Sequence, residues 1–173
     1  MKAAEYLKYG APEVVQIKEV AKPTPKDNEV LVKVYATSVN LTDCGFRSGK
    51  PYIVRLFSGL LRPRQTILGS DFAGEVETVG KEVKTFKTGD KVFGFHPDFF
   101  GAHAQYICLP EEASFTNMPQ NLSYEEAAAI CEGAHYANNY LKDVDFKKQP
   151  KILINGATGA IGTAAVQLAK YYG

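Results

Sequence analysis

The protein has 173 residues, of which 45% are hydrophobic and 23% charged, and its 20 basic and 19 acidic residues give a formal net charge of +1. This composition is typical of an ordinary soluble globular protein. The charges form no basic stripe of the kind that binds nucleic acid, and no apolar run approaches the roughly 18 residues that span a membrane. We therefore expect neither nucleic acid nor a membrane among its partners. The lack of a signal peptide and of a CxxC pair favours a reducing, cytoplasmic location.

Residues 1 to about 120 show the alternation of polar and apolar side chains that is typical of β-strands. Segment 15–18 alternates in this way, and segment 29–39 (EVLVKVYATSV) has a period of two that places Val30, Val32 and Val34 on one face. Three more strands are expected in DFAGEVETVG, DKVFGF and HAQYICLP, which are separated by Gly, Pro and Asp turns. Short strands at this spacing predict a small barrel or sandwich.

Between these strands the sequence predicts one helix and one unusual connector. The helix begins near Asn40, whose side chain can cap it, and Gly49 is a suitable stop. The connector, segment 51–67 (PYIVRLFSGLLRPRQTI), is longer and more apolar than a typical loop. Two interpretations of it stay open. Either it lines the mouth of a substrate site that takes bulky apolar molecules, or it contacts a partner subunit.

The pattern changes at residue 121. Ser123 and Glu126 form an S-x-x-E capping box, which predicts a helix of four or five turns. A β-strand is then expected at 151–155 (KILIN), followed by a glycine-rich turn and a helix at 163–172 (TAAVQLAKYY). We therefore divide the chain into a β domain, residues 1–121, and the beginning of an α/β domain, residues 122–173.

The glycine-rich turn GATGAIG carries the strongest chemical signal. Gly156, Gly159 and Gly162 lie three residues apart between the expected strand and helix. In dinucleotide-binding folds the first glycine permits a tight turn, the second lets the backbone approach a pyrophosphate, and the third lets the helix pack on the strand. Backbone N–H groups and the helix dipole then attract the anion. The spacing is GxxGxxG rather than GxGxxG, so a turn that needs glycine for sterics alone is the alternative.

Together with this turn, three further stretches resemble the zinc-free quinone oxidoreductase branch of the medium-chain dehydrogenase/reductases. They are KPTPKDNEVLVKVYATSVNLTDCGFRSG, LGSDFAGEVETVGKEVKTFKTGDKVFG and AAAICEGAHYANNYL, and they occur in the family's order. The resemblance implies a mostly β, partly open GroES-like barrel, followed by a helix and one βα unit of an incomplete Rossmann domain. It also implies hydride transfer between a nicotinamide cofactor, NADPH in preference to NADH, and a small quinone, enone, carbonyl or alcohol.

The same resemblance implies which residues hold the cofactor and that zinc is not needed. In zinc-dependent relatives the first ligand matches Asn40 and the G-H-E motif matches residues 69–71 (GSD), so only Cys131 remains near a ligand position. The stretch PDFFGAHAQY has no cysteine for a structural zinc. We therefore expect no metal site. The expected cofactor-binding residues are Asn40, Gly156, Ala157, Thr158, Gly159, Ala160, Ile161 and Gly162.

Three side chains are candidates for catalysis without a metal. The resemblance places Asn40 near the nicotinamide and the substrate oxygen, and a helix N-cap is its alternative role. Tyr52 matches an aromatic residue near the substrate, or is an ordinary packed tyrosine. His135 could protonate an enolate or alkoxide, or be a hydrogen-bonded helix residue. The expected structural or loop residues, without a catalytic role, are Asp43, His96 and His103.

The residue that distinguishes NAD from NADP is expected about 20 residues after the glycine turn, beyond Gly173. We therefore expect weak or no turnover by this chain alone. The expected strand 151–155 would have two unpaired edges, so we expect it to pair with the same segment of another chain in a homo-oligomer. The alternative function is a GroES-like binding or assembly module without hydride chemistry, which would not respond to NADPH.

Overall fold

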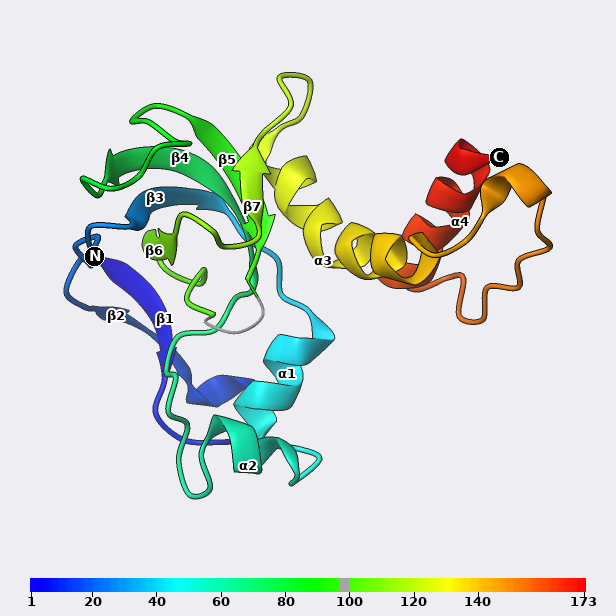
Figure 1. The fold of residues 1–173 in the computed structure, drawn as a ribbon. Coiled ribbons are helices and arrows are strands. Elements are labelled where there is room, and N and C mark those ends of the chain that lie inside the picture. Colours follow the sequence, from blue (N-terminus) through cyan, green and yellow to red (C-terminus); the bar gives the residue numbers. More distant parts are fainter. Residues whose placement is uncertain (97–99) are drawn as a thin grey trace. The chain divides into compact units, whose positions relative to one another are not determined.

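The computed structural model describes residues 1–96 and 100–173 (Figure 1). They form two compact units, Met1–Ala128 and Ala129–Gly173. Helix α3 (Tyr124–Leu141) contributes its first turn to the first unit and its remainder to the second. Residues 97–99, which belong to the stretch expected to lack a structural-zinc lobe, lie outside the described residues. In the part of the chain that the structure describes, no helix is long and apolar enough to cross a membrane.

The first unit is built on an antiparallel five-stranded sheet in the order β6-β3-β4-β5-β7. Val30 and Val32 of β3 are fully buried and share a core with Phe72 and Leu109, as the period of two predicts. A register shift between Val34 and Ala36 marks a bulge where β3 ends, and such bulges re-aim the side chains that follow. The strands are β3 (Glu29–Ala36), β4 (Asp71–Val79), β5 (Lys91–Phe95), β6 (Tyr106–Pro110) and β7 (Phe115–Asn117).

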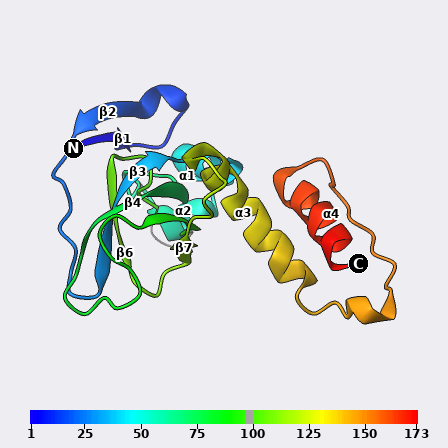
Figure 2. The ribbon, with the colours of Figure 1, turned by 90° about the horizontal axis from the view of Figure 1, so that it is seen from above.

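A second antiparallel pair, β1 (Lys2–Tyr6) and β2 (Val15–Glu19), lies along one side of this sheet (Figure 2). Single bridges from Ala3 to Ala104 and from Glu5 to Ile67 connect β1 to neighbouring loops. Both sheets stay open, so the expected mostly β, partly open architecture is confirmed. β1 and β7 were not predicted, because each has little alternation of its own and is held by its pairing with another strand.

Helix α1 (Leu41–Ser48) confirms the helix expected at Asn40. Asn40 is its N-cap, and Gly49 ends it with a φ of 61°. A second short helix, α2 (Val54–Ser58), lies within the apolar connector, so the prediction of a single helix in this half is wrong. Five residues are too few to show a helical period in the sequence. A 3₁₀ turn (Pro12–Val14) precedes β2.

The second unit contains most of α3, a 3₁₀ turn (Phe146–Lys148) and helix α4 (Ala160–Tyr172). The capping box at the start of α3 is confirmed: the Ser123 N–H donates to the Glu126 carboxylate at 2.8 Å, and the Glu126 N–H donates to Ser123 Oγ at 3.2 Å. Helix α4 begins at Ala160 rather than at Thr163 as predicted, so part of the glycine stretch is helical. The buried core of this unit is small and consists of Ala137, Leu141 and Ala165.

The strand predicted at 151–155 is wrong, because this segment has no regular secondary structure. Among the described residues, every strand belongs to the two sheets of the first unit. A strand takes its backbone hydrogen bonds from a neighbouring strand, whereas a helix makes its own. Without such a neighbour, the apolar sequence leaves Leu153 95% exposed.

Candidate active site

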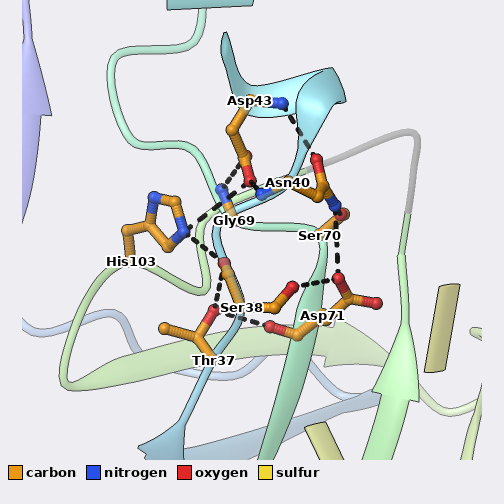
Figure 3. Close-up of polar contacts among 8 residues, drawn as sticks. All are labelled: Thr37, Ser38, Asn40, Asp43, Gly69, Ser70, Asp71 and His103. Carbon is orange, nitrogen blue, oxygen red and sulfur yellow. Dashed lines mark hydrogen bonds and ion pairs between the residues drawn. The ribbon is translucent and has the colours of Figure 1, made fainter. Parts of the chain in front are cut away.

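Residues 37–43, residues 69–71 and His103 of the first unit meet in a polar cluster, which is buried at Asp43, Ser70 and Asp71 and exposed at Thr37 (Figure 3). Residues 37–40 connect β3 to α1, residues 69–71 lead into β4, and a histidine comes from the loop before β6. We use the name polar cluster for this set, which consists of Thr37, Ser38, Asn40, Asp43, Gly69, Ser70, Asp71 and His103.

Asn40 uses its whole side-chain amide within the protein. Its Oδ1 accepts a hydrogen bond from the Asp43 N–H at 3.0 Å, which caps α1. Its Nδ2 donates to Ser70 Oγ at 3.1 Å and to Asp71 Oδ2 at 3.2 Å. The N-cap interpretation is therefore confirmed. A role toward a substrate oxygen stays a prediction, and it would require one of these two amide hydrogen bonds to be released.

Asp71 is a buried carboxylate that several donors surround. The hydroxyl of Ser38 and the amide of Asn40 both donate to its Oδ2. Thr37 Oγ1 donates to the Asp71 carbonyl at 2.7 Å and ties the end of β3 to the start of β4. Asp71 and the adjacent Ser70 are both almost completely buried. Burial of a carboxylate costs free energy unless such donors are present, so the donors and Asp71 hold one another in place.

Asp43 joins α1 to the loop before β4, which agrees with its expected structural role. One carboxylate oxygen accepts from the Asn40 N–H at 3.0 Å and the other from the Gly69 N–H at 2.9 Å, and the residue is 3% exposed. His103 Nε2 lies 2.8 Å from the Ser38 carbonyl oxygen and 3.9 Å from the Asp43 carboxylate. No periodic pattern in the sequence indicates the position of His103. The glycine at position 69 is the sequence feature that accompanies this contact. Its φ is 92°, and a Cβ there would lie 2.5 Å from the His103 ring.

The two positions that resemble zinc-ligand positions, Asn40 and Ser70, are hydrogen-bonded to each other. Cys131, which the resemblance placed near the third ligand position, is buried in α3 within the second unit. Among the described residues, no three His, Cys, Asp or Glu side chains are grouped to hold a metal ion. Zinc independence stays a prediction, which elemental analysis tests.

Tyr52 and His135 lie outside the polar cluster. Tyr52 is 68% exposed before α2, with the Arg55 guanidinium carbon 5.1 Å from its ring centre. His135 is exposed on α3 in the second unit, with its Nε2 3.1 Å from Asn139 Nδ2 and its ring edge-on to Tyr136. The catalytic roles of both residues stay predictions.

The three glycines of the turn in the second unit differ in whether the backbone requires a glycine at their position. Gly156 has a φ of 75°, which favours glycine. A Cβ on Gly162 would lie 2.2 Å from the Gly156 carbonyl oxygen, so the close approach of α4 to the turn excludes any side chain there. Gly159, the N-cap of α4, has a φ of −81°, and a Cβ there would make only an ordinary contact of 3.7 Å. Sterics within the described residues therefore explain Gly156 and Gly162 but not Gly159.

A cavity of about 670 Å³ borders one side of the polar cluster. Thr37, Asp43 and His103 form part of its wall, and the remainder comes mainly from apolar residues of β1, β2 and β3. Neither Asn40 nor Tyr52 lines it. A molecule in this cavity would thus contact the Asp43 and His103 side of the cluster rather than the predicted catalytic side chains.

Comparison with known proteins identifies a matching domain family and relatives of similar sequence. Residues 26–120 match the alcohol dehydrogenase GroES-like domain family. The chain is 37% identical to the quinone oxidoreductase of Sus scrofa over 177 residues, which is 100% of this chain and 50% of that protein. It is 32% identical to the chloroplastic NADPH-dependent alkenal/one oxidoreductase of Arabidopsis thaliana over 179 residues, 99% of this chain and 45% of that protein.

The fold is similar to that of the quinone oxidoreductase from Coxiella burnetii, with a TM-score of 0.87 and 31% identity over 100% of this chain and 54% of that one. The chain spans about half the length of the curated relatives that it matches. The chain therefore belongs to the alcohol dehydrogenase GroES-like domain family, and over its whole length it is similar to quinone oxidoreductases.

Proposed function

We propose that this chain provides the substrate side and the pyrophosphate turn of an NADPH-dependent oxidoreductase that reduces quinones or α,β-unsaturated carbonyls. The observation that carries the proposal is Gly159, where no contact within the described residues requires a glycine. It stands at the exposed start of α4, between two glycines that the turn itself requires. The names of the pig and Arabidopsis relatives support a quinone or an alkenal as substrate and NADPH as cofactor. We assign residues 1–121 to the GroES-like domain and 122–173 to the Rossmann domain.

The start of α4 has the groups that a pyrophosphate needs. The first N–H groups of a helix have no partner within it, and among the described residues those of Ala160, Ile161 and Gly162 find none elsewhere. Ala157 and Thr158 are exposed beside them. These N–H groups and the positive end of the helix dipole suit an anion. When bound, NADPH supplies the hydride, and this turn orients its phosphates.

The polar cluster supports chemistry without zinc. The Asn40 amide places its two N–H donors against the oxygens of Ser70 and Asp71. A cation bound by those oxygens would have to displace the amide, and the cap on α1 would be lost with it. We therefore propose that the polar cluster has a structural role and holds the start of α1 and the adjoining substrate surface in position.

The proposed reaction requires a proton donor as well as a hydride. Addition of hydride to the β-carbon of an enone leaves an enolate, whose α-carbon then takes a proton. Tyr52 and His135 are exposed and can approach a ligand, and we propose them as groups that bind or protonate the substrate. Asn40 is proposed to bind the carbonyl oxygen after one of its amide hydrogens is released from Ser70.

The proposal is tested by transfer of deuterium to trans-2-hexenal from NADPH that carries deuterium at both positions of C4 of the nicotinamide. The protein is purified from its own cells and dialysed against a chelator. We expect hexanal with one deuterium on C3, formed at the same rate before and after dialysis. Unlabelled product, or activity that returns only with added zinc, would contradict the proposal. No reaction and no response to NADPH would favour a binding module without hydride chemistry.

We also propose that the protein forms a homo-oligomer through segment 151–155. The segment carries three consecutive apolar residues, of which Leu153 is almost fully exposed and Ile152 partly so. Pairing with the same segment of a second copy would supply the neighbouring strand that it lacks among the described residues.

A further inference from the structure

The first unit contains a cavity of about 390 Å³ that is separate from the polar cluster. It lies where the end of β1, the middle of α1 and the end of α2 come together. Its volume is within the range of about 300–1,000 Å³ that is typical of small-molecule sites. Four aromatic residues and three polar residues line it, namely Tyr6, Phe46, Phe57, Phe100, Ser58, Arg64 and Gln65.

Tyr6 supplies a hydroxyl-bearing side chain to the cavity lining, although the residue as a whole is only 2% exposed. Burial, together with Tyr9 and Asp43, raises the pKa of Tyr6 to about 12. The hydroxyl therefore keeps its proton at neutral pH and can donate it to an acceptor.

Arg64 supplies a positive charge that no described carboxylate neutralises. Residues 44–70 contain no Asp or Glu, and Arg64 forms no ion pair with a described residue. Its position is set by the backbone, because the Arg64 N–H donates to the Ser58 carbonyl at 2.8 Å. Gly59 permits this tight loop: its φ is 123°, and a Cβ there would lie 2.1 Å from the Arg62 carbonyl oxygen and 3.3 Å from Arg64 Cγ.

The aromatic side chains form the apolar part of the cavity. Phe46 and Phe100 pack at 4.7 Å between ring centres with their planes tilted by 56°. Phe57 is 75% exposed although it lines the cavity, which places a large, mostly exposed apolar ring at the rim. Aromatic rings bind other rings in stacked or tilted arrangements with centres about 4.5–7 Å apart.

We propose that this cavity binds a planar aromatic carboxylate of one or two rings. The ring lies between Phe46, Phe57 and Phe100, the carboxylate pairs with the Arg64 guanidinium, and the Tyr6 hydroxyl donates a further hydrogen bond. Arginine suits a carboxylate because its planar fork donates two parallel hydrogen bonds. This site is independent of the proposed reductase function, because it shares no lining residue with the polar cluster or with the glycine turn.

The test is calorimetric titration of the chain with 2-naphthoate and with the neutral 2-naphthalenemethanol. We expect saturable binding of naphthoate. Arg64→Met should weaken naphthoate at least tenfold, about 1.4 kcal/mol, and leave the alcohol unchanged. Tyr6→Phe should weaken both ligands about fivefold. Arg62→Met is the matched control, because Arg62 is an exposed neighbouring cation that does not line the cavity, and it should bind both ligands as the unmodified chain does.

Three results would overturn the proposal. The first is the absence of saturable naphthoate binding by the unmodified chain, and the second is an equal loss in Arg62→Met and Arg64→Met, which would indicate unspecific attraction to positive charge. The third is unchanged naphthoate binding by Arg64→Lys. Circular dichroism checks that each variant is folded. If Arg64→Met fails to fold, Arg64→Lys replaces it. Because lysine keeps the charge but not the fork, Arg64→Lys should lose about threefold, and unchanged binding would contradict the proposed pairing.

Discussion

The two units of the chain differ in what holds their backbone in place. The first buries long side chains such as Val32, Phe72 and Leu109 between strands that are paired across many residues. The second has two helices around a core with only one large buried side chain, Leu141, and its most strand-like segment, 151–155, has no strand. Helices and caps form from local signals in both units, whereas strands form only where a neighbour is available. A segment's own sequence therefore specifies its helices and caps, whereas its strands also depend on other segments.

The largest expected effect is the loss of a large core side chain in the first unit. Phe72→Ala should lower the free energy of unfolding of that unit by about 4 kcal/mol, because it leaves a cavity among fully buried residues. Leu141→Ala should act on the second unit alone. Urea denaturation followed by amide hydrogen exchange separates the two. If Leu141→Ala lowered the protection of β3 as much as Phe72→Ala does, the two units would not be separate bodies.

Removal of the Asp43 carboxylate should have the next largest effect. Asp43→Ala leaves the N–H groups of Asn40 and Gly69 without their acceptor, which should cost the first unit about 3 kcal/mol. Asp27→Ala is the control, since that carboxylate is mostly exposed and its loss should cost less than about 0.5 kcal/mol. Equal effects of the two substitutions in urea denaturation would show that the polar cluster does not stabilise the fold.

Substitutions of the turn glycines should separate an effect on NADPH affinity from an effect on the fold. Gly159→Val should weaken NADPH at least tenfold, about 1.4 kcal/mol, and leave α4 folded, because a Cβ at this position meets only an ordinary contact of 3.7 Å. Gly162→Ala should disrupt the turn itself, since its Cβ would lie 2.2 Å from the Gly156 carbonyl oxygen. Fluorescence titration with NADPH and circular dichroism measure the two properties. Unchanged affinity in Gly159→Val would place the cofactor elsewhere.

Leu153→Asp tests the proposed pairing of segment 151–155. A charge at this exposed apolar position should convert an oligomer to a monomer in light scattering, because paired strands would bury it. The control is Lys151→Asp, which changes charge at the edge of the same segment without removing an apolar group. A protein that is monomeric before substitution would contradict the pairing.

The smallest expected effect is a pH dependence of the first unit. Burial raises the pKa of Tyr6 from its usual 10 to about 12. The neutral hydroxyl thus stabilises the folded state fully below pH 10, and this stability is lost as the pH rises toward 12. Unfolding free energies measured from pH 9 to 12 should fall less steeply in Tyr6→Phe than in the unmodified chain. Identical slopes would mean that Tyr6 titrates as it does in the unfolded state.

Much of the fold could be predicted because its signals are local. The period of two in 29–39, the cap at Asn40 and the pair Ser123 and Glu126 each specify an element within a few residues. The second helix, α2, has no such signal, because five residues span little more than one turn and cannot show a repeating pattern. The strand at 151–155 was predicted from its apolar residues and from its place before the glycine turn, and neither signal contains the neighbouring strand on which a strand depends.

The candidate site shows the same division. The sequence indicated Asn40, Ser70 and Asp71 through their motif positions, but not that the two hydrogens of the Asn40 amide point at the other two residues. His103 was assigned to a plain loop, because its contact with Ser38 joins residues far apart in the chain. The glycine spacing was visible, whereas the reason that separates Gly159 from Gly162 lies in distances between backbone atoms.

The most direct test of the account is an amide-resolved NMR titration of the chain with NADPH in the presence of a chelator. We expect saturable shifts of the amide signals of residues 156–163, at the turn and the start of α4, and the loss of these shifts in Gly159→Val. Shifts that spare this turn, or that need added zinc, would contradict the claim that it is a metal-independent site for the cofactor's phosphates.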